Sequence, residues 1–440
     1  MLFAFPIFLG QVFQQLYNTF DAWCVGYFIN DDAMGAVTSS GSLIFLMVSF
    51  FNGLAMGAGV VIARYYGAKN DEAVSKTIHT AIAFGLCTGT ALTIVGITCT
   101  PMIVRWMGIP DATMVYAIPY YRFYFCGAIF TVMYNIFVGI HHAVGDSKHP
   151  LYYLICSTMV NIVLDLLFVG VMGYGVGAAA LATTISQGIS AALCCIHLMR
   201  SHGSSRLYLR KVKFHWQSLQ EIIRYGLPSA VQNSVIALAN VVVQSNIFAF
   251  GPDAVNGCGA YSKLEGFAFL PVMCFSQSLS TFTGQNLGAK QHDRVKKGVG
   301  FGIACSLIMA EIVGVLSYVF APQLIGIFAK SQEAISFGTR HMRTICLFYC
   351  LLAFSHCIAG IMRGAGKASV PMFTMLACWC VIRVSYITIA VRFVPELTTV
   401  SWAYPITWTL SSIVFLVYYL KADWIHNFDR IEAKKAASRK

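Results

Sequence analysis

Residues 67–69, Gly-Ala-Lys, recur as residues 288–290, and this pair marks a repeat at a fixed spacing of 221 residues. The register holds without a gap from Asp32 to Pro150. Its other landmarks are Pro101 and Pro322, Arg122 and Arg343, Gly145 and Gly366, and Pro150 and Pro371. Glycine and proline at loops and helix ends fix the backbone geometry there. We therefore expect a duplicated protein whose halves fold as the same unit, with a site between them.

The composition places the chain in a lipid bilayer. It has 440 residues, of which 57% are hydrophobic and 11% charged, and its mean hydropathy is +0.68. So little polar surface cannot coat a soluble globule. Apolar stretches long enough to cross a hydrocarbon core of about 30 Å recur along the chain. They predict an all-α membrane protein with twelve transmembrane helices, at 2–29, 35–63, 75–104, 113–141, 150–172, 176–199, 219–249, 255–285, 298–328, 335–362, 368–391 and 399–420.

The net charge of +12 reflects membrane topology and not a nucleic-acid partner. Lysine and arginine gather in the loops that follow even-numbered helices and in the C-terminal tail, whereas the intervening loops hold only Arg105, Lys330 and Arg392. The positive-inside rule then places both termini in the cytoplasm. We expect a multi-pass protein of the cell membrane that contacts lipid, is a monomer, and begins with a transmembrane helix instead of a cleaved signal peptide.

The two halves are predicted to be parallel repeats, because each contains an even number of helices. We expect an N-lobe at 1–200, a polar cytoplasmic linker at 201–217, a C-lobe at 218–421 and a cytoplasmic tail at 422–440. Parallel repeats are related by an axis along the membrane normal, and transporters built this way bind substrate and ions in the cavity between the repeats.

The first predicted helix carries an acid that is expensive at membrane depth. Asp21 continues a stripe of polar side chains at helical spacing, with Gln14 and with Tyr17 or Asn18. An ionisable residue there costs about 3 kcal/mol unless it has a partner or water. The stripe therefore predicts the wall of a cavity and part of the substrate site. The alternative is that Asp21 lies near the helix exit and is simply solvated.

A second acid lies in the fifth predicted helix, where Asn161 and Asp165 are one turn apart on one face. Together with Asp21 they form a candidate site for cation coupling, because oxygen ligands suit Na⁺ and paired carboxylates in low dielectric share a proton. The coupling ion would be H⁺ or Na⁺, with no other cofactor. The alternative is a hydrogen-bonded polar clamp between the first and fifth helices that takes no part in a transport cycle. Thr183, Thr184, Ser186 and Gln187 of the sixth helix fit either arrangement.

Other polar residues leave alternatives open. Glu265 either faces the cavity or pairs with Lys263 or Arg383, and it has no acidic counterpart at the 221-residue spacing. The pair His141 and His142 resembles a metal motif only superficially and is interpreted as a solvated helix end. The chain has no Cys-x-x-Cys and no Cys/His set at the spacing of a zinc site.

These residues resemble the MATE (multidrug and toxic compound extrusion) family over the whole chain. No single stretch is decisive, but their order and spacing make the resemblance specific. The stretches are 6–26, 57–69, 145–150, 161–165, 175–187, 284–289 and 363–371.

The resemblance implies two six-helix bundles around a V-shaped central cleft, and export of cationic or amphipathic compounds in exchange for H⁺ or Na⁺. By similarity, Asp21, Asn161, Asp165 and one of Thr183 or Thr184 would occupy the family's N-lobe cation site. NorM-like members place further acids on helices 7 and 10, but residues 229–243 and 347–359 contain no Asp or Glu here. This difference favours a DinF-type member over a NorM-type one.

The sequence therefore predicts a secondary active multidrug efflux transporter that works by alternating access. One rival is a flippase for a lipid-linked oligosaccharide, whose pyrophosphate would require several Arg and Lys in the cavity. The membrane interior has few of these, and its clearest polar cluster is acidic. The other rival is a membrane enzyme, which we do not expect because no HExxH, no GxSxG and no convincing pair of nucleophile and base is present.

Overall fold

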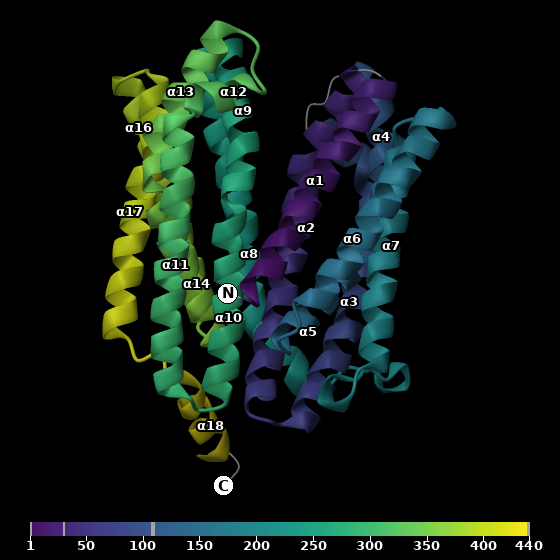
Figure 1. Cartoon of the computed structure of the whole chain (residues 1–440), viewed down its shortest axis with the longest axis vertical. Helices are drawn as coiled ribbons and strands as arrows, with labels where there is room; N and C mark the ends of the chain where they lie inside the picture. The colour runs from purple at the N-terminus through teal and green to yellow at the C-terminus, as the bar shows by residue number, and fades with distance from the viewer. Residues whose placement is uncertain (1, 30, 107–110, 438–440) are drawn as a thin grey trace. The chain divides into compact units, whose positions relative to one another are not determined.

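The structure is a computed structural model that describes residues 2–29, 31–106 and 111–437 (Figure 1). The described residues form helices and no strand, as predicted. The chain divides into two compact units, Met1–Ala230 and Val231–Lys440. This division falls within a helix that follows the predicted linker at 201–217, and the predicted domain boundaries stay a prediction.

The first unit contains the helices that correspond to the first six predicted spans. They are α1 (Ala4–Phe28), α2 (Asp31–Gly67), α3 (Asp71–Trp106), α4 (Asp111–Cys126), α5 (Ala128–Ala143), α6 (Lys148–Asp165) with the π-helix η1 (Leu166–Val171), and α7 (Gly177–Arg200). Two short 3₁₀ turns, η2 (Gly203–Ser205) and η3 (Leu209–Lys211), lead to α8 (Trp216–Ile247), which enters the second unit.

The second unit continues from α8 with the remaining spans and the tail. After η4 (Phe248–Phe250) come α9 (Pro252–Ala268), α10 (Leu270–Gly288), α11 (His292–Val319), α12 (Ala321–Gly326), α13 (Gln332–Ile345), η5 (Cys346–Phe348) and α14 (Tyr349–Gly364). The last elements are α15 (Ser369–Met375), the π-helix η6 (Leu376–Ile382), α16 (Arg383–Phe393), α17 (Leu397–Lys421) and α18 (Asn427–Ala437).

Nine of the described helical stretches are long and apolar enough to cross a membrane, and a tenth does so if α4 and α5 count as one bent span. Helix α1 is outside this set, although its 25 residues would cross the bilayer. Its polar stripe lowers its hydropathy. The helices fall into twelve successive stretches that match the predicted spans, which agrees with the predicted fold class.

Three predicted spans are interrupted. The span predicted at 113–141 breaks at Gly127, where α4 and α5 meet at 46°. The span predicted at 255–285 breaks at Phe269, just before Pro271, because proline lacks the N–H donor and clashes with the preceding turn. The span predicted at 298–328 is also wrong in its bounds, since α11 ends at Val319 and a separate helix, α12, starts at Ala321 with Pro322 in its first turn.

The repeat predicted from the sequence is confirmed in the backbone. Lys69 and Lys290 are the two described non-glycine residues with positive φ, at 53° and 56°. Each occupies the left-handed position of a Schellman cap: Lys69 N–H donates to Tyr66 O at 3.1 Å, and Lys290 N–H donates to Leu287 O at 3.1 Å. The same turn therefore ends α2 and α10, and in each turn a lysine adopts a left-handed conformation that is strained for any residue except glycine.

A second pair of turns agrees with the repeat in the same way. Gly145 and Gly366 have φ of 91° and 75°, and their N–H groups donate to His142 O and Arg363 O at 3.0 and 2.9 Å. These turns end α5 and α14. The halves therefore share their helix-end geometry at these two landmarks, whereas Pro101 lies inside α3 and Pro322 lies in the first turn of α12.

The linker is docked on the first unit. Tyr208 N–H donates to His79 Nε2 at 3.1 Å, and His215 N–H donates to Thr80 Oγ1 at 3.1 Å. At the start of α8, Glu221 accepts from the Tyr65 hydroxyl at 2.8 Å and lies 3.8 Å from the guanidinium of Arg64. These contacts fasten the segment between the repeats to α2 and α3.

Candidate cation-coupling site

Helices α1, α6 and α7 bring four of the predicted coupling residues together inside the first unit. Asp21 comes from α1, Asn161 and Asp165 come from α6, and Thr183 comes from α7. All four are buried: Asn161 and Asp165 have no exposed surface, and Asp21 and Thr183 are 6% exposed. The alternative that Asp21 is solvated at a helix exit is wrong, because it lies two turns before the end of α1 and is covered by protein.

Thr183 makes a hydrogen bond that links two helices within this cluster. Its hydroxyl lies 3.0 Å from Asp21 Oδ2 and 3.0 Å from the carbonyl oxygen of Ala179 in its own helix. The hydroxyl has a single hydrogen. It can donate to an ionised Asp21, or it can donate to Ala179 and accept a hydrogen bond from a neutral Asp21. Thr183 is therefore compatible with either charge state of the acid.

The other polar atoms of the cluster lack hydrogen-bond partners. Asp21 Oδ1, both carboxyl oxygens of Asp165 and both amide atoms of Asn161 are buried without one. The carboxyl groups of Asp21 and Asp165 face each other closely enough to interact through space. Two carboxylates cannot both remain charged in such a place without a cation or a proton between them. The arrangement can hold one positive charge.

The helix that carries Asp165 changes its form directly after it. Residues 166–171 adopt the π-helix η1, which continues α6. π-Helical turns widen the backbone spiral by one residue and are frequent at functional sites. The sequence carries no local sign of this change, and the span predicted at 150–172 is a single regular helix.

Two further predicted residues line the cluster, and three do not. Tyr17 and Gln187 are 5% and 6% exposed, and both lie beside Thr183. Gln14 is half-buried and Asn18 is exposed, so the predicted polar stripe turns away from the cluster at Asn18. Thr184 lies on another face of α7, where its hydroxyl donates to Phe123 O at 3.1 Å. Of the two predicted threonines, Thr183 alone contacts Asp21.

Tyrosines of α4 close the site and were missed in the sequence analysis. Tyr120 and Tyr124, one helical turn apart, lie near Asp21, and their rings stack at 6.3 Å. Their spacing of four residues is the signal that could have found them. Tyrosine supplies an apolar wall with a polar tip, which suits the boundary between buried acids and a hydrophobic ligand.

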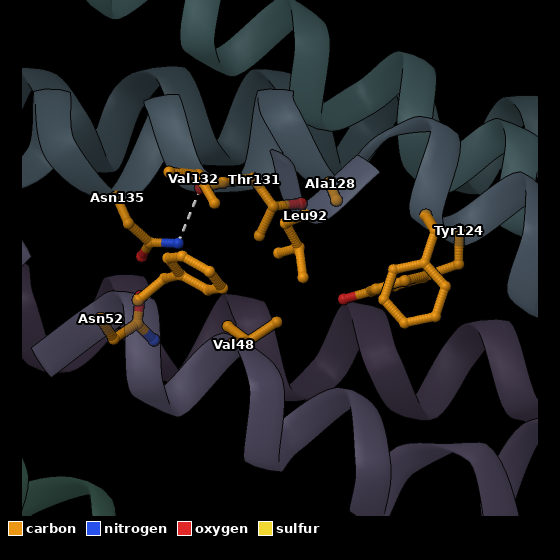
Figure 2. A pocket seen from close by; sticks show the side chains of 10 residues that line it. Val48, Asn52, Leu92, Tyr124, Ala128, Thr131, Val132 and Asn135 are labelled. Carbon is orange, nitrogen blue, oxygen red and sulfur yellow. Dashed lines mark hydrogen bonds between the residues drawn. The ribbon is translucent and has the colours of Figure 1, made fainter. Parts of the chain in front are cut away.

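A narrow pocket opens behind these tyrosines, next to the break between α4 and α5 (Figure 2). Asn52 of α2 and Asn135 of α5 extend into it from facing helices, and Tyr124 reaches in from α4 (Figure 2). The Asn135 amide donates to Thr131 O at 2.8 Å. The pocket has room for about one water molecule and lies where the bend of the fourth span meets Tyr124.

Glu265 belongs to a different arrangement, in the second unit. The Tyr261 hydroxyl donates to its Oε1 at 3.1 Å. Arg383 is buried nearby, donates to Thr407 Oγ1 at 3.0 and 3.2 Å, and lies over the rings of Tyr404 and Trp379. Lys263 turns towards the ring of Phe328, 5.4 Å away. Among the described residues, Glu265 forms no ion pair within 4.0 Å with either base, so the alternative of a direct pair with Lys263 or Arg383 is wrong, although Glu265 and Arg383 interact through space.

Comparison with known proteins identifies the family of this chain. The family model MatE matches the chain twice, over residues 6–167 and 228–389, so that each match covers most of one half. The chain belongs to the MatE family. It is therefore a multi-pass membrane protein of a transporter family, and the resemblance inferred from its sequence is confirmed at the level of the family.

Curated relatives span nearly the whole length of the chain. A probable multidrug resistance protein of Bacillus subtilis, YoeA, is 28% identical over 432 residues, covering 95% of this chain and 92% of its own length. Probable multidrug resistance protein NorM of Thermotoga maritima is 25% identical over 383 residues, covering 86% of this chain and 82% of its own.

Solved structures share the fold. The outward-facing conformation of a multidrug resistance MATE family transporter matches with a TM-score of 0.90 and 23% identity, covering 98% of this chain and 94% of that one. A Vibrio cholerae MATE transporter, VcmN, matches with a TM-score of 0.89 and 17% identity, covering 96% and 97%. At such identities the comparison supports the architecture and does not assign individual residues.

Proposed function

We propose that this MatE protein is a secondary active exporter that expels cationic or amphipathic organic compounds in exchange for H⁺ or Na⁺. One observation carries the proposal: two buried carboxyl groups, Asp21 and Asp165, face each other with unpartnered oxygens. Binding a cation or a proton there replaces repulsion by attraction, so the occupied and vacant sites favour different packing of α1 against α6. A ligand shifts a conformational equilibrium only by such a difference.

The printed names of the relatives supply the substrate class. YoeA and NorM are described as probable multidrug resistance proteins, and the more distant MepA of Staphylococcus saprophyticus, 21% identical, as a multidrug export protein. We extend this description to the present chain. Export by alternating access would take place in the cell membrane, with both termini in the cytoplasm as the distribution of Lys and Arg predicts. The protein would act as a monomer.

The location of the acids supports a DinF-type member. The cluster lies wholly within the first unit, and residues 229–243 and 347–359 of α8 and of η5 to α14 contain no Asp or Glu. We propose that coupling uses the first half alone. Glu265, hydrogen-bonded to Tyr261, would then shape the substrate cavity and take no part in ion binding.

The surroundings of the buried guanidinium groups argue against the flippase. Among the described residues, three arginines are buried, and each has a protein partner: Arg64 lies beside Glu221, Arg363 donates to Ser276, and Arg383 donates to Thr407. A pyrophosphate would need such groups free to form paired hydrogen bonds. The exporter therefore fits the described charges better.

Efflux from vesicles tests this function. Purified protein would be reconstituted in liposomes loaded with a fluorescent organic cation, and pH and Na⁺ gradients would be imposed in separate experiments. We expect one gradient to accelerate efflux over protein-free liposomes. An efflux rate that responds to neither gradient would rule out the antiporter.

A further inference from the structure

Three helix ends of the first unit bring together two histidines and an aspartate. His141 lies in the last turn of α5, Asp146 in the turn between α5 and α6, and His197 in the last turn of α7. One donor atom from each side chain lies within 4.8 Å of the other two. The cluster is separate from Asp21 and Asp165, and the proposed antiport does not use it.

His141 is prepared to bind a metal ion. The interpretation of this residue as part of a solvated helix end is wrong, because it is 1% exposed. Its Nδ1 lies 2.7 Å from Phe137 O. Since a carbonyl oxygen only accepts, Nδ1 carries the hydrogen and Nε2 presents a lone pair. That Nε2 is buried and has no hydrogen-bond partner. A backbone acceptor that fixes the tautomer in this way is typical of metal-binding histidines.

The other two side chains are also held from behind. His197 Nδ1 lies 2.9 Å from the Tyr153 hydroxyl, which leaves Nε2 directed at Asp146 Oδ2, 3.8 Å away. The other oxygen of Asp146 accepts from the backbone N–H groups of Lys148 and His149, each at 3.2 Å. Outer partners of this kind keep first ligands in place.

A fourth side chain lies beside these three. The ring of His149 lies 4.1 Å from that of His197 and 2.7 Å from Asp146 Oδ2, so a fourth donor is at hand.

We propose that His141, Asp146 and His197 bind one divalent transition-metal ion of the Zn²⁺ type, with His149 or water as the fourth ligand. Imidazole and carboxylate are ligands of Zn²⁺, whereas Mg²⁺ and Ca²⁺ prefer oxygen alone. Zinc bonds of about 2.0–2.1 Å place tetrahedral ligands about 3.3 Å apart. On binding, the donor atoms would therefore draw together by about 1.5 Å or less.

The ion would link the ends of α5 and α7 through the turn that starts α6. This site belongs to one half only, because the residues at the 221-residue spacing from its three ligands are Met362, Lys367 and Tyr418. A metal ion there would stabilise the first unit alone. The first half would then have a metal site that the second half lacks.

Calorimetric titration of the full-length protein with ZnCl₂ tests the site. The protein would be in detergent, free of any affinity tag and treated with a chelator first. His141→Gln and His197→Gln each remove one ligand, and His202→Gln, at an exposed linker histidine, is the matched control. Thermal unfolding with and without Zn²⁺ provides a second readout, and MgCl₂ replaces ZnCl₂ as the control ion.

We expect one Zn²⁺ per chain in the wild type and in His202→Gln, at least tenfold weaker binding in both ligand variants, and no binding of Mg²⁺. Zn²⁺ should raise the unfolding temperature only where the site is intact. Absence of saturable binding by the wild type, or wild-type affinity in both ligand variants, would overturn the proposal. If His141→Gln does not fold, His197→Gln decides, because its side chain is already 28% exposed.

Discussion

Gly360→Ala should weaken the second unit, whereas the equivalent change in the first, Gly139→Ala, should not. A Cβ at position 360 would lie 2.3 Å from the carbonyl oxygen of Ser276 in α10. Ordinary contacts begin near 3.4 Å, so α14 and α10 would have to separate by about 1 Å in a closely packed interior. A Cβ at 139 would lie 3.5 Å from Ala55 O, which is an ordinary contact.

The magnitude follows from the same contacts. Overpacking costs about 1–3 kcal/mol. Moving α10 also disturbs Ser276 Oγ, which donates to His356 O at 2.7 Å and accepts from Arg363 at 3.0 Å, and a hydrogen bond contributes about 1 kcal/mol. We expect a loss of about 2–4 kcal/mol for Gly360→Ala. Gly139→Ala should instead stabilise by about 0.5–1 kcal/mol, because alanine favours the helix.

Thermal unfolding in detergent, followed by size-exclusion chromatography with fluorescence detection, measures the difference. Gly364→Ala is a second test, since its Cβ would lie 2.3 Å from Ser280 O, while the equivalent residue of the first half is already Ala143. A midpoint that falls as far for Gly139→Ala as for Gly360→Ala would refute this reasoning. An unchanged midpoint for Gly360→Ala would refute it as well.

Two further predictions use matched pairs. Thr183→Val keeps the side-chain volume but removes the hydrogen bond to Asp21, so efflux from liposomes should fall about tenfold, the effect of losing about 1.4 kcal/mol. The efflux rate of Thr184→Val should stay within about twofold of the wild type. Equal losses in the two variants would contradict the assignment of Thr183 to the site. Gly145→Ala and Gly366→Ala should each cost about 1–2 kcal/mol in thermal unfolding because of their positive φ. Gly366→Ala should cost more, since its Cβ would lie 2.6 Å from the ring of Phe428, and a smaller loss than for Gly145→Ala would contradict this account.

Hydropathy and the repeat predicted the helices because membrane burial leaves few options for the backbone. Most predicted spans end within about four residues of the observed helices. The breaks were harder to predict. Pro271 carries a local signal that was overlooked, whereas the bend at Gly127 depends on packing, since a Cβ there would lie 2.3 Å from Thr184 Oγ1.

The acids of the site could be predicted because a carboxyl group inside an apolar helix is rare, since burying it in the membrane costs free energy. The sequence could not choose between Thr183 and Thr184, because neighbouring residues face different sides of a helix and the direction of α7 depends on its packing. His141 and His197 are 56 positions apart, so no local spacing joins them. Only the fold brings α5 and α7 together at that end.

The central claim is that Asp21 and Asp165 couple ion movement to export. Its most direct test is gradient-driven efflux from proteoliposomes by the wild type, Asp21→Asn and Asp165→Asn. Glu311→Gln, which neutralises a membrane acid in the second unit, serves as the matched control. We predict that both aspartate variants fold but lose acceleration by the coupling gradient, while Glu311→Gln retains it. Full, gradient-dependent efflux by Asp21→Asn and Asp165→Asn would contradict the claim.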